Sequence, residues 1–144
     1  MQSTESWTRP ALRVWTLTQR FQKFVVVGAI GLVVNQGMLY LLMSMTDFAL
    51  ALASPVSIVI SMIVTFTLNE LWTWHDRGHG RVGQRAVMYG TINSGGLLIN
   101  AGILLFLHGH GFHYLLANLV GAGLAAIWNF GLNNMITWRK LPSS

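Results

Sequence analysis

Two stretches of the chain, FTLNELWTW at Phe66–Trp74 and FGLNNMITW at Phe130–Trp138, are variants of one phrase. Each closes a long apolar run and is followed within a few residues by arginine. A shift of 64 positions, from 69 to 133, superimposes their shared Leu-Asn and Thr-Trp pairs. The phrase therefore predicts a chain built from two copies of one unit.

The composition predicts a membrane protein. Of 144 residues, 53% are hydrophobic and 9% are charged, and mean hydropathy is positive, unlike a soluble domain. Apolar runs of 22 or 23 residues lie at about 24–45, 49–71, 86–107 and 114–136. At ~1.5 Å rise per residue, each crosses the ~30 Å hydrocarbon layer as a helix. The sequence predicts an all-α integral membrane protein with four spans.

The basic residues predict the topology. They lie before the first span, between the second and third, and after the fourth: Arg9, Arg13, Arg20, Lys23, Arg77, Arg81, Arg85, Arg139 and Lys140. By the positive-inside rule, both termini and the central loop are cytoplasmic. The high pI follows from this topology and gives no reason to expect nucleic-acid binding.

Residues 1–23 are predicted to form a cytoplasmic segment that contains an amphipathic helix on the membrane surface. Pro10 suits a helix start, and Val14, Leu17 and Phe21 fall on one stripe. Residues 24–140 form the predicted four-span domain, and residues 141–144 form a cytoplasmic tail. Because each repeat has two spans, the copies are parallel repeats, related by a pseudo-twofold axis along the membrane normal.

Asparagines recur inside the spans. A shift of 65, from 35 to 100, superimposes Asn35 on Asn100 and Gly31 on Gly96. Two interpretations stay open: the amides bond between packed helices, or they line a path for a cargo rich in hydroxyl groups. The predicted path consists of Asn35, Asn69, Asn93, Asn100, Asn129, Asn133 and Trp128.

These motifs resemble the GtrA-like family of small four-span membrane proteins over about residues 20–140. The resemblance is carried by Lys23-Phe24, Gly28, Asn35, Phe66, Leu68, Asn69 and Trp72-Thr73-Trp74. It implies flippase-type movement of a polyprenyl-phosphate-linked sugar, such as undecaprenyl-phosphate glucose, to the outer face of the bacterial inner membrane. The sugar there modifies O-antigen, teichoic acid or another cell-surface polysaccharide. Related modules occur with glycosyltransferases, which makes such an enzyme a second implied partner.

The sequence departs from the family pattern after the span-ending asparagine. Family members commonly have a basic residue there, whereas this chain has Glu70 and Asn134. Glu70 is an interfacial carboxylate or a possible coupling acid. For a lipid phosphate that docks on the cytoplasmic side, the predicted binding residues are six of the nine basic side chains: Lys23, Arg77, Arg81, Arg85, Arg139 and Lys140.

The sequence predicts no enzyme, cofactor or metal. It contains no nucleophile, base and orienting group in a set, and no phosphate-cradling glycine loop. The histidine pair at 75 and 79 has no cysteine to complete a zinc site, because the chain contains none. The alternatives to transport are a scaffold for a polyprenyl-phosphate glycosyltransferase and a small multidrug exporter. A homodimer is also predicted, with Ala117, Gly121 and Ala125 as one contact.

Overall fold

The computed structural model describes residues 5–47 and 49–142, which form helices and turns without a strand. The helices are α1 (Glu5–Met45), α2 (Leu50–Leu68), α3 (Val82–Gly109) and α4 (Tyr114–Leu132). Two π-helices follow α2 and α4: η1 (Asn69–Thr73) and η2 (Asn133–Thr137). Four helices are long and apolar enough to cross a membrane, so the predicted all-α membrane fold is confirmed. Residues 1–4 and 143–144 of the predicted terminal segments lie outside the described residues.

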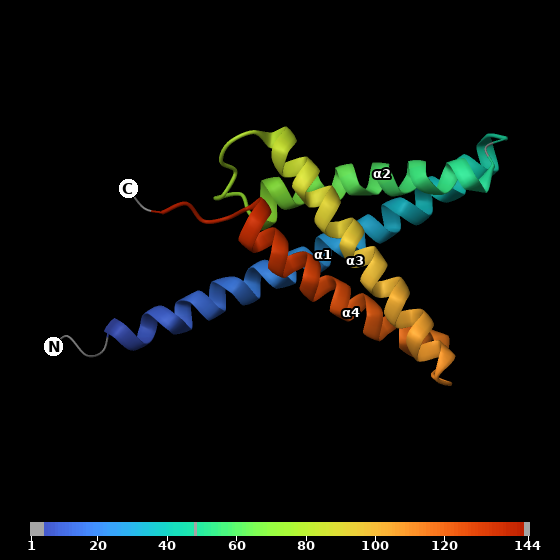
Figure 1. The fold of residues 1–144 in the computed structure, drawn as a ribbon. Coiled ribbons are helices and arrows are strands. Elements are labelled where there is room, and N and C mark those ends of the chain that lie inside the picture. The colour runs from blue at the N-terminus through green and yellow to red at the C-terminus, as the bar shows by residue number, and fades with distance from the viewer. Residues whose placement is uncertain (1–4, 48, 143–144) are drawn as a thin grey trace. The chain divides into compact units, whose positions relative to one another are not determined.

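The chain divides into two compact units between His75 and Asp76. In the first unit α1 lies beside α2, and in the second α3 lies beside α4 (Figure 1). Short turns reverse the chain between the helices of each pair, which gives two helical hairpins. The hairpins expected from the repeated phrase are thus present.

Helix α1 is longer than a membrane span requires. Its 41 residues extend about 60 Å at 1.5 Å per residue, twice the thickness of the hydrocarbon layer. The predicted surface helix is helical from Glu5, but it continues into the first span without a break. No glycine or proline lies between Pro10 and Gly28 to interrupt the backbone hydrogen bonds.

In each hairpin the two helices are in close contact at a glycine, where there is no space for a side chain. In the first, Ser61 Oγ donates to the Gly31 carbonyl oxygen at 2.6 Å, and a Cβ at Gly31 would overlap Thr65 Cγ2. In the second, a Cβ at Gly96 would overlap the carboxamide of Asn129. Gly31 and Gly96 occupy the same repeat position. In both hairpins the absence of a side chain at this glycine lets the two helices approach closely.

The small-residue face of α4 lies inside its own hairpin. Ala117, Gly121 and Ala125 are all buried, and a Cβ at Gly121 would lie 2.9 Å from the Asn100 carbonyl oxygen of α3. This face packs against α3 and is not available as the dimer contact that the sequence predicted. The homodimer itself stays a prediction.

The close approach at Gly31 predicts that alanine destabilises the protein more at this position than at Gly28. Gly31→Ala should lower the free energy of unfolding by about 1–3 kcal/mol, because Thr65 is β-branched and cannot move aside easily. Gly28→Ala is the matched control, since no atom lies within 4 Å of its added Cβ. Far-UV circular dichroism during SDS titration in mixed micelles measures both. Equal stabilities for the two variants would contradict the packing described here.

Candidate functional site

The first hairpin ends in a π-helical turn closed by side chains. The Trp74 N–H donates to the Asn69 carbonyl oxygen at 2.9 Å, five residues back, which is the π-helical pattern. Thr73 Oγ1 donates to Asn69 Oδ1 at 2.8 Å. The buried Trp74 ring meets Phe24 edge-on, with centroids 5.8 Å apart, and Arg20 Nη1 donates to the Thr73 carbonyl oxygen at 3.4 Å. Asn69 is therefore part of the structure that ends the hairpin.

The second hairpin repeats this arrangement. The Trp138 N–H donates to the Asn133 carbonyl oxygen at 2.8 Å, and Thr137 Oγ1 donates to Asn133 Oδ1 at 2.7 Å. Tyr89 meets Trp138 edge-on at 5.8 Å. Arg85, which matches Arg20 in the repeat, is buried and donates to the carbonyl oxygen of a loop residue, His79. The duplication therefore extends to the hydrogen bonds of Asn133, Thr137 and Trp138, whereas His79, which accepts from Arg85, is not the repeat match of Thr73.

The predicted path asparagines fall into two groups. Asn69 and Asn133 are fully buried, and Asn133 Nδ2 also donates to Asn93 Oδ1 at 3.4 Å. By contrast, the side-chain oxygens of three others are buried and have no hydrogen-bond partner within the described residues: Asn35, Asn100 and Asn129. An unsatisfied buried acceptor costs about 1–3 kcal/mol. The first group stabilises the ends of the hairpins through hydrogen bonds. The second group has side-chain oxygens that can still accept a hydrogen bond.

Trp128 lies within α4, ten residues before the Trp138 that follows η2. Its indole N–H donates to the Ile92 carbonyl oxygen of α3 at 3.2 Å, and a Cβ at Gly95 would lie 3.1 Å from that nitrogen. The side chain remains 42% exposed. The indole N–H is therefore engaged, while part of the ring surface stays accessible.

A cationic cavity opens at the η2 end of the second hairpin. Its volume is about 450 Å³, and we name it the arginine cavity for Arg77, Arg81, Arg85 and Arg139 in its wall. None of the described residues that line it is acidic. Apolar side chains, including Met88 and Met135, complete the wall beside Thr137 and Gln84. The cavity combines positive charge with an apolar surface, which suits an anionic lipid headgroup.

Two of the four arginines are held by the protein, and two are not. Arg77 Nη1 donates to Asn134 Oδ1 at 2.8 Å and to the Trp138 carbonyl oxygen at 3.3 Å. Arg85 is fixed by its loop contact. Arg81 and Arg139 are exposed, and neither side chain makes a hydrogen bond or ion pair within residues 5–47 and 49–142. Their guanidinium groups are available to an anion.

The remaining predicted residues lie elsewhere. Lys23 belongs to the first hairpin, where its ammonium group is 5.7 Å from the centroid of the Trp72 ring. Lys140 is exposed and does not line the arginine cavity. Glu70, the possible coupling acid, lies in the first turn of η1 and is partly buried. No group of three metal-ligating side chains was found among the described residues.

The sequence contained a signal for the buried arginines that the prediction did not use. Arg20 and Arg85 are separated by the same 65 positions as Gly31 and Gly96. Gln84, in the cavity wall, is matched in the same way by Gln19. Extending the repeat alignment upstream of the first span would have identified both pairs.

Comparison with known proteins gives two matches. Residues 23–138 match the family model for the GtrA/DPMS transmembrane domain. The chain is also 33% identical over 122 residues to a dolichol-phosphate mannosyltransferase of Pyrococcus furiosus. That alignment covers 83% of this chain but 34% of the relative, so the chain spans about a third of the length of that enzyme.

The hydrogen bond from Thr137 Oγ1 to Asn133 Oδ1 in η2 predicts the effect of removing the threonine hydroxyl group. Thr137→Val should destabilise the second hairpin by about 1–3 kcal/mol, since Asn133 Oδ1 loses a buried donor. Thr91→Val is the control, because Thr91 is exposed and bonds only within its own helix, to Val87. SDS titration of the purified variants compares them. A stable Thr137→Val protein would show that this hydrogen bond does not hold the turn.

Proposed function

Because the chain belongs to the GtrA/DPMS transmembrane-domain family, we propose that it translocates a polyprenyl-phosphate-linked monosaccharide. Transport runs from the cytoplasmic to the outer face of the bacterial inner membrane and supplies cell-surface polysaccharide modification. The observation that carries the proposal is the arginine cavity, at the end of a hairpin whose helices contain unpartnered carboxamide oxygens. The relative from Pyrococcus furiosus is a dolichol-phosphate mannosyltransferase, which supports the same class of lipid.

The first step is docking of the lipid phosphate. Arg81 and Arg139 each offer a planar guanidinium group for bidentate contact with phosphate oxygens. Arg77 and Arg85 add positive charge from fixed positions. The methionines of the wall receive the first prenyl units. The positive-inside rule puts this end of the hairpin in the cytoplasm, where the sugar lipid is made.

The second step is passage of the sugar. A hydroxyl group that enters hydrocarbon without a partner costs several kcal/mol. The side-chain oxygens of Asn35, Asn100 and Asn129 are acceptors without partners in this structure, and the exposed part of the Trp128 ring offers a stacking surface. When the helices of a hairpin separate, the groups of that hairpin replace the water lost by the sugar while the prenyl tail stays in lipid.

Transport is facilitated and not driven by ATP, since the sequence lacks a phosphate-cradling glycine loop. A headgroup with one negative charge gains about 2.3 kcal/mol per 100 mV when it moves outward across an inside-negative potential. Removal of the sugar lipid at the outer face by a transferase keeps net transport directed outward.

Neutralising the two unpaired arginines tests the docking step. Arg81→Gln plus Arg139→Gln should reduce the translocation rate at least about tenfold, because two charge-assisted contacts are lost. Lys140→Gln, which removes a charge outside the cavity, should leave the rate near that of the parent. The measurement uses liposomes loaded with a radiolabelled short-chain polyprenyl-phosphate glucose and follows its exposure to an external hydrolase. Equal losses in both proteins would contradict docking in the arginine cavity.

Removing the unpartnered amides tests the path. Asn35→Leu plus Asn100→Leu should fold normally and translocate at least about tenfold more slowly, since hydroxyl groups lose their acceptors. Gln36→Leu plus Asn118→Leu is the control, because both of these amides are exposed. The same liposome assay compares the pairs.

A second candidate function is a scaffold for a polyprenyl-phosphate glycosyltransferase. It is favoured by the internal bonding of Asn69 and Asn133 and by a relative that is a mannosyltransferase, of whose length the alignment covers 34%. A scaffold needs its basic loops but not its unpartnered amides. Translocation by the parent protein no faster than in protein-free liposomes would favour the scaffold, whereas unchanged translocation by the Asn35 and Asn100 double variant would contradict the amide path.

A further inference from the structure

A second cavity lies in the first hairpin, at the repeat position of the arginine cavity. Its volume is about 360 Å³, and we name it the tryptophan cavity; it is lined by Gln19, Gln22, Lys23, Val26 and Trp72. Three of these residues match residues that line the arginine cavity: Gln19 matches Gln84, Lys23 matches Met88, and Trp72 matches Ile136. The duplication therefore left a cavity in both copies and changed the side chains around it.

The backbone beside the tryptophan cavity is held firmly. Trp72 lies within η1, whose ends are joined by the bond from Thr73 Oγ1 to Asn69 Oδ1. The buried Arg20, between two cavity residues in sequence, donates to the Thr73 carbonyl oxygen. Trp72 is thus presented from a fixed turn, as a binding site requires.

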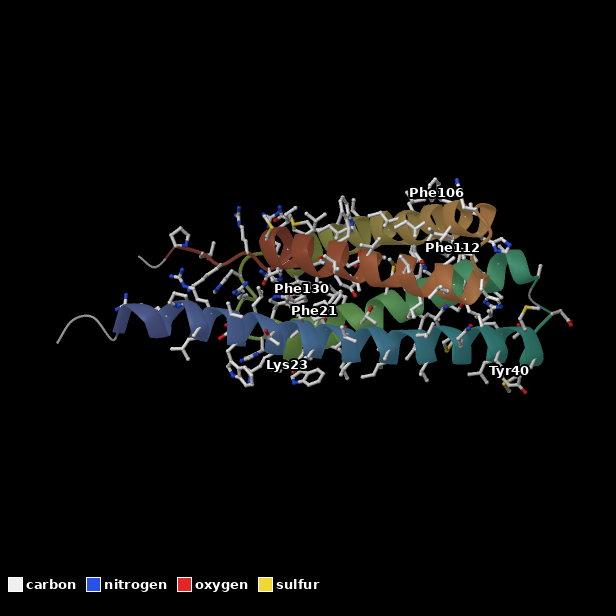
Figure 2. All side chains as sticks on the ribbon, turned by 90° about the horizontal axis from the view of Figure 1, so that it is seen from below. Phe21, Lys23, Tyr40, Phe106, Phe112 and Phe130 are labelled. Atoms are coloured by element: carbon white, nitrogen blue, oxygen red, sulfur yellow. The ribbon has the colours of Figure 1, made fainter. Side chains whose placement is uncertain are left out.

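The wall has the chemistry of a site for an anionic sugar. The Trp72 side chain is 42% exposed, and Lys23, which projects from α1 (Figure 2), places one positive charge near its ring. Each glutamine amide can both donate and accept, as sugar hydroxyl groups require. An aromatic residue that only anchors the helix in the interface needs neither the cavity nor the two amides.

We propose that the tryptophan cavity binds a glycosyl phosphate group. The sugar ring stacks on Trp72, its hydroxyl groups bond to Gln19 and Gln22, and Lys23 neutralises the single charge of a phosphodiester. This inference rests on the proposed function, because it names a second site, separate from the arginine cavity, that binds the glycosyl phosphate end of the same lipid.

Saturation-transfer NMR on the protein in nanodiscs of zwitterionic lipid tests this site, since sugar-based detergents would compete. The protein carries Arg81→Gln and Arg139→Gln, which removes phosphate binding by the arginine cavity. The probes are glucose 1-phosphate, mannose 1-phosphate and glycerol 3-phosphate, which has a phosphate but no ring. At least one sugar phosphate should bind about tenfold more tightly than glycerol 3-phosphate, because only the sugars have a ring face for stacking.

Substitution of Trp72 identifies the site. Trp72→Leu should weaken binding of the sugar phosphate about tenfold, and Trp72→Phe should retain most of it, because a ring face remains. Trp15→Leu is the matched control: Trp15 is exposed on α1 of the same hairpin but does not line the cavity. Lys23→Met, which restores the residue of the other repeat, should abolish the preference for glucose 1-phosphate over methyl glucoside.

Three results would overturn the inference: equal binding of glycerol 3-phosphate, unchanged binding by Trp72→Leu, or equal losses in Trp72→Leu and Trp15→Leu. If the parent protein transports the lipid but the tryptophan cavity binds no sugar phosphate, the inference fails and the proposed function stands. If Trp72-dependent binding is found without transport, the proposed function fails and the site stands.

Discussion

The fold depends on one constraint: polar groups in a hydrocarbon layer must find partners within the protein. The spans satisfy it with helical hydrogen bonds, but every helix end leaves backbone groups unpaired. Each hairpin addresses this with a π-helical turn, in which Asn69 or Asn133 accepts from a tryptophan N–H through its backbone and from a threonine hydroxyl through its side chain. The turn also fixes the backbone beside each cavity. The same few hydrogen bonds therefore support both the end of each hairpin and the backbone beside its cavity.

The spans could be predicted because hydropathy is a property of the sequence alone, and the duplication because both repeats retain the residues that close the hairpin. The π-helical turns could not, since a bond across five residues has no compositional signal that separates it from one across four. The continuous α1 has a similar explanation: amphipathicity indicated a helix before residue 23, but it could not show where that helix ended.

The asparagines show the limit of sequence analysis most clearly. Spacing identified which amides lie on one helical face, but not which atom each would meet. Asn69 and Asn133 bond to a threonine on the next turn of their own helix, whereas Asn100 lies against Gly121, with its side-chain oxygen unpartnered. Only the approach of α3 to α4 separates a structural amide from one with unused capacity. The arginine cavity needed the same information, because its residues come from a loop, from α3, from η2 and from the chain after η2.

The unpartnered oxygens bear on how such a protein could open. Three buried acceptors, each costing about 1–3 kcal/mol when unsatisfied, make the packed state less stable than a fully bonded one. A state with the helices apart, where the same oxygens bond to water or cargo, is correspondingly easier to reach. The hairpin ends work against this, because there the amides are bonded and the tryptophans fully buried. Each hairpin is held by hydrogen bonds at η1 or η2 and has at least one unpartnered oxygen along its spans. Separation of the two spans is therefore easier than disruption of the π-helical turn. Under the proposed transport function, a lipid headgroup bound at a cavity beside η1 or η2 would then stay bound while the spans of that hairpin separate.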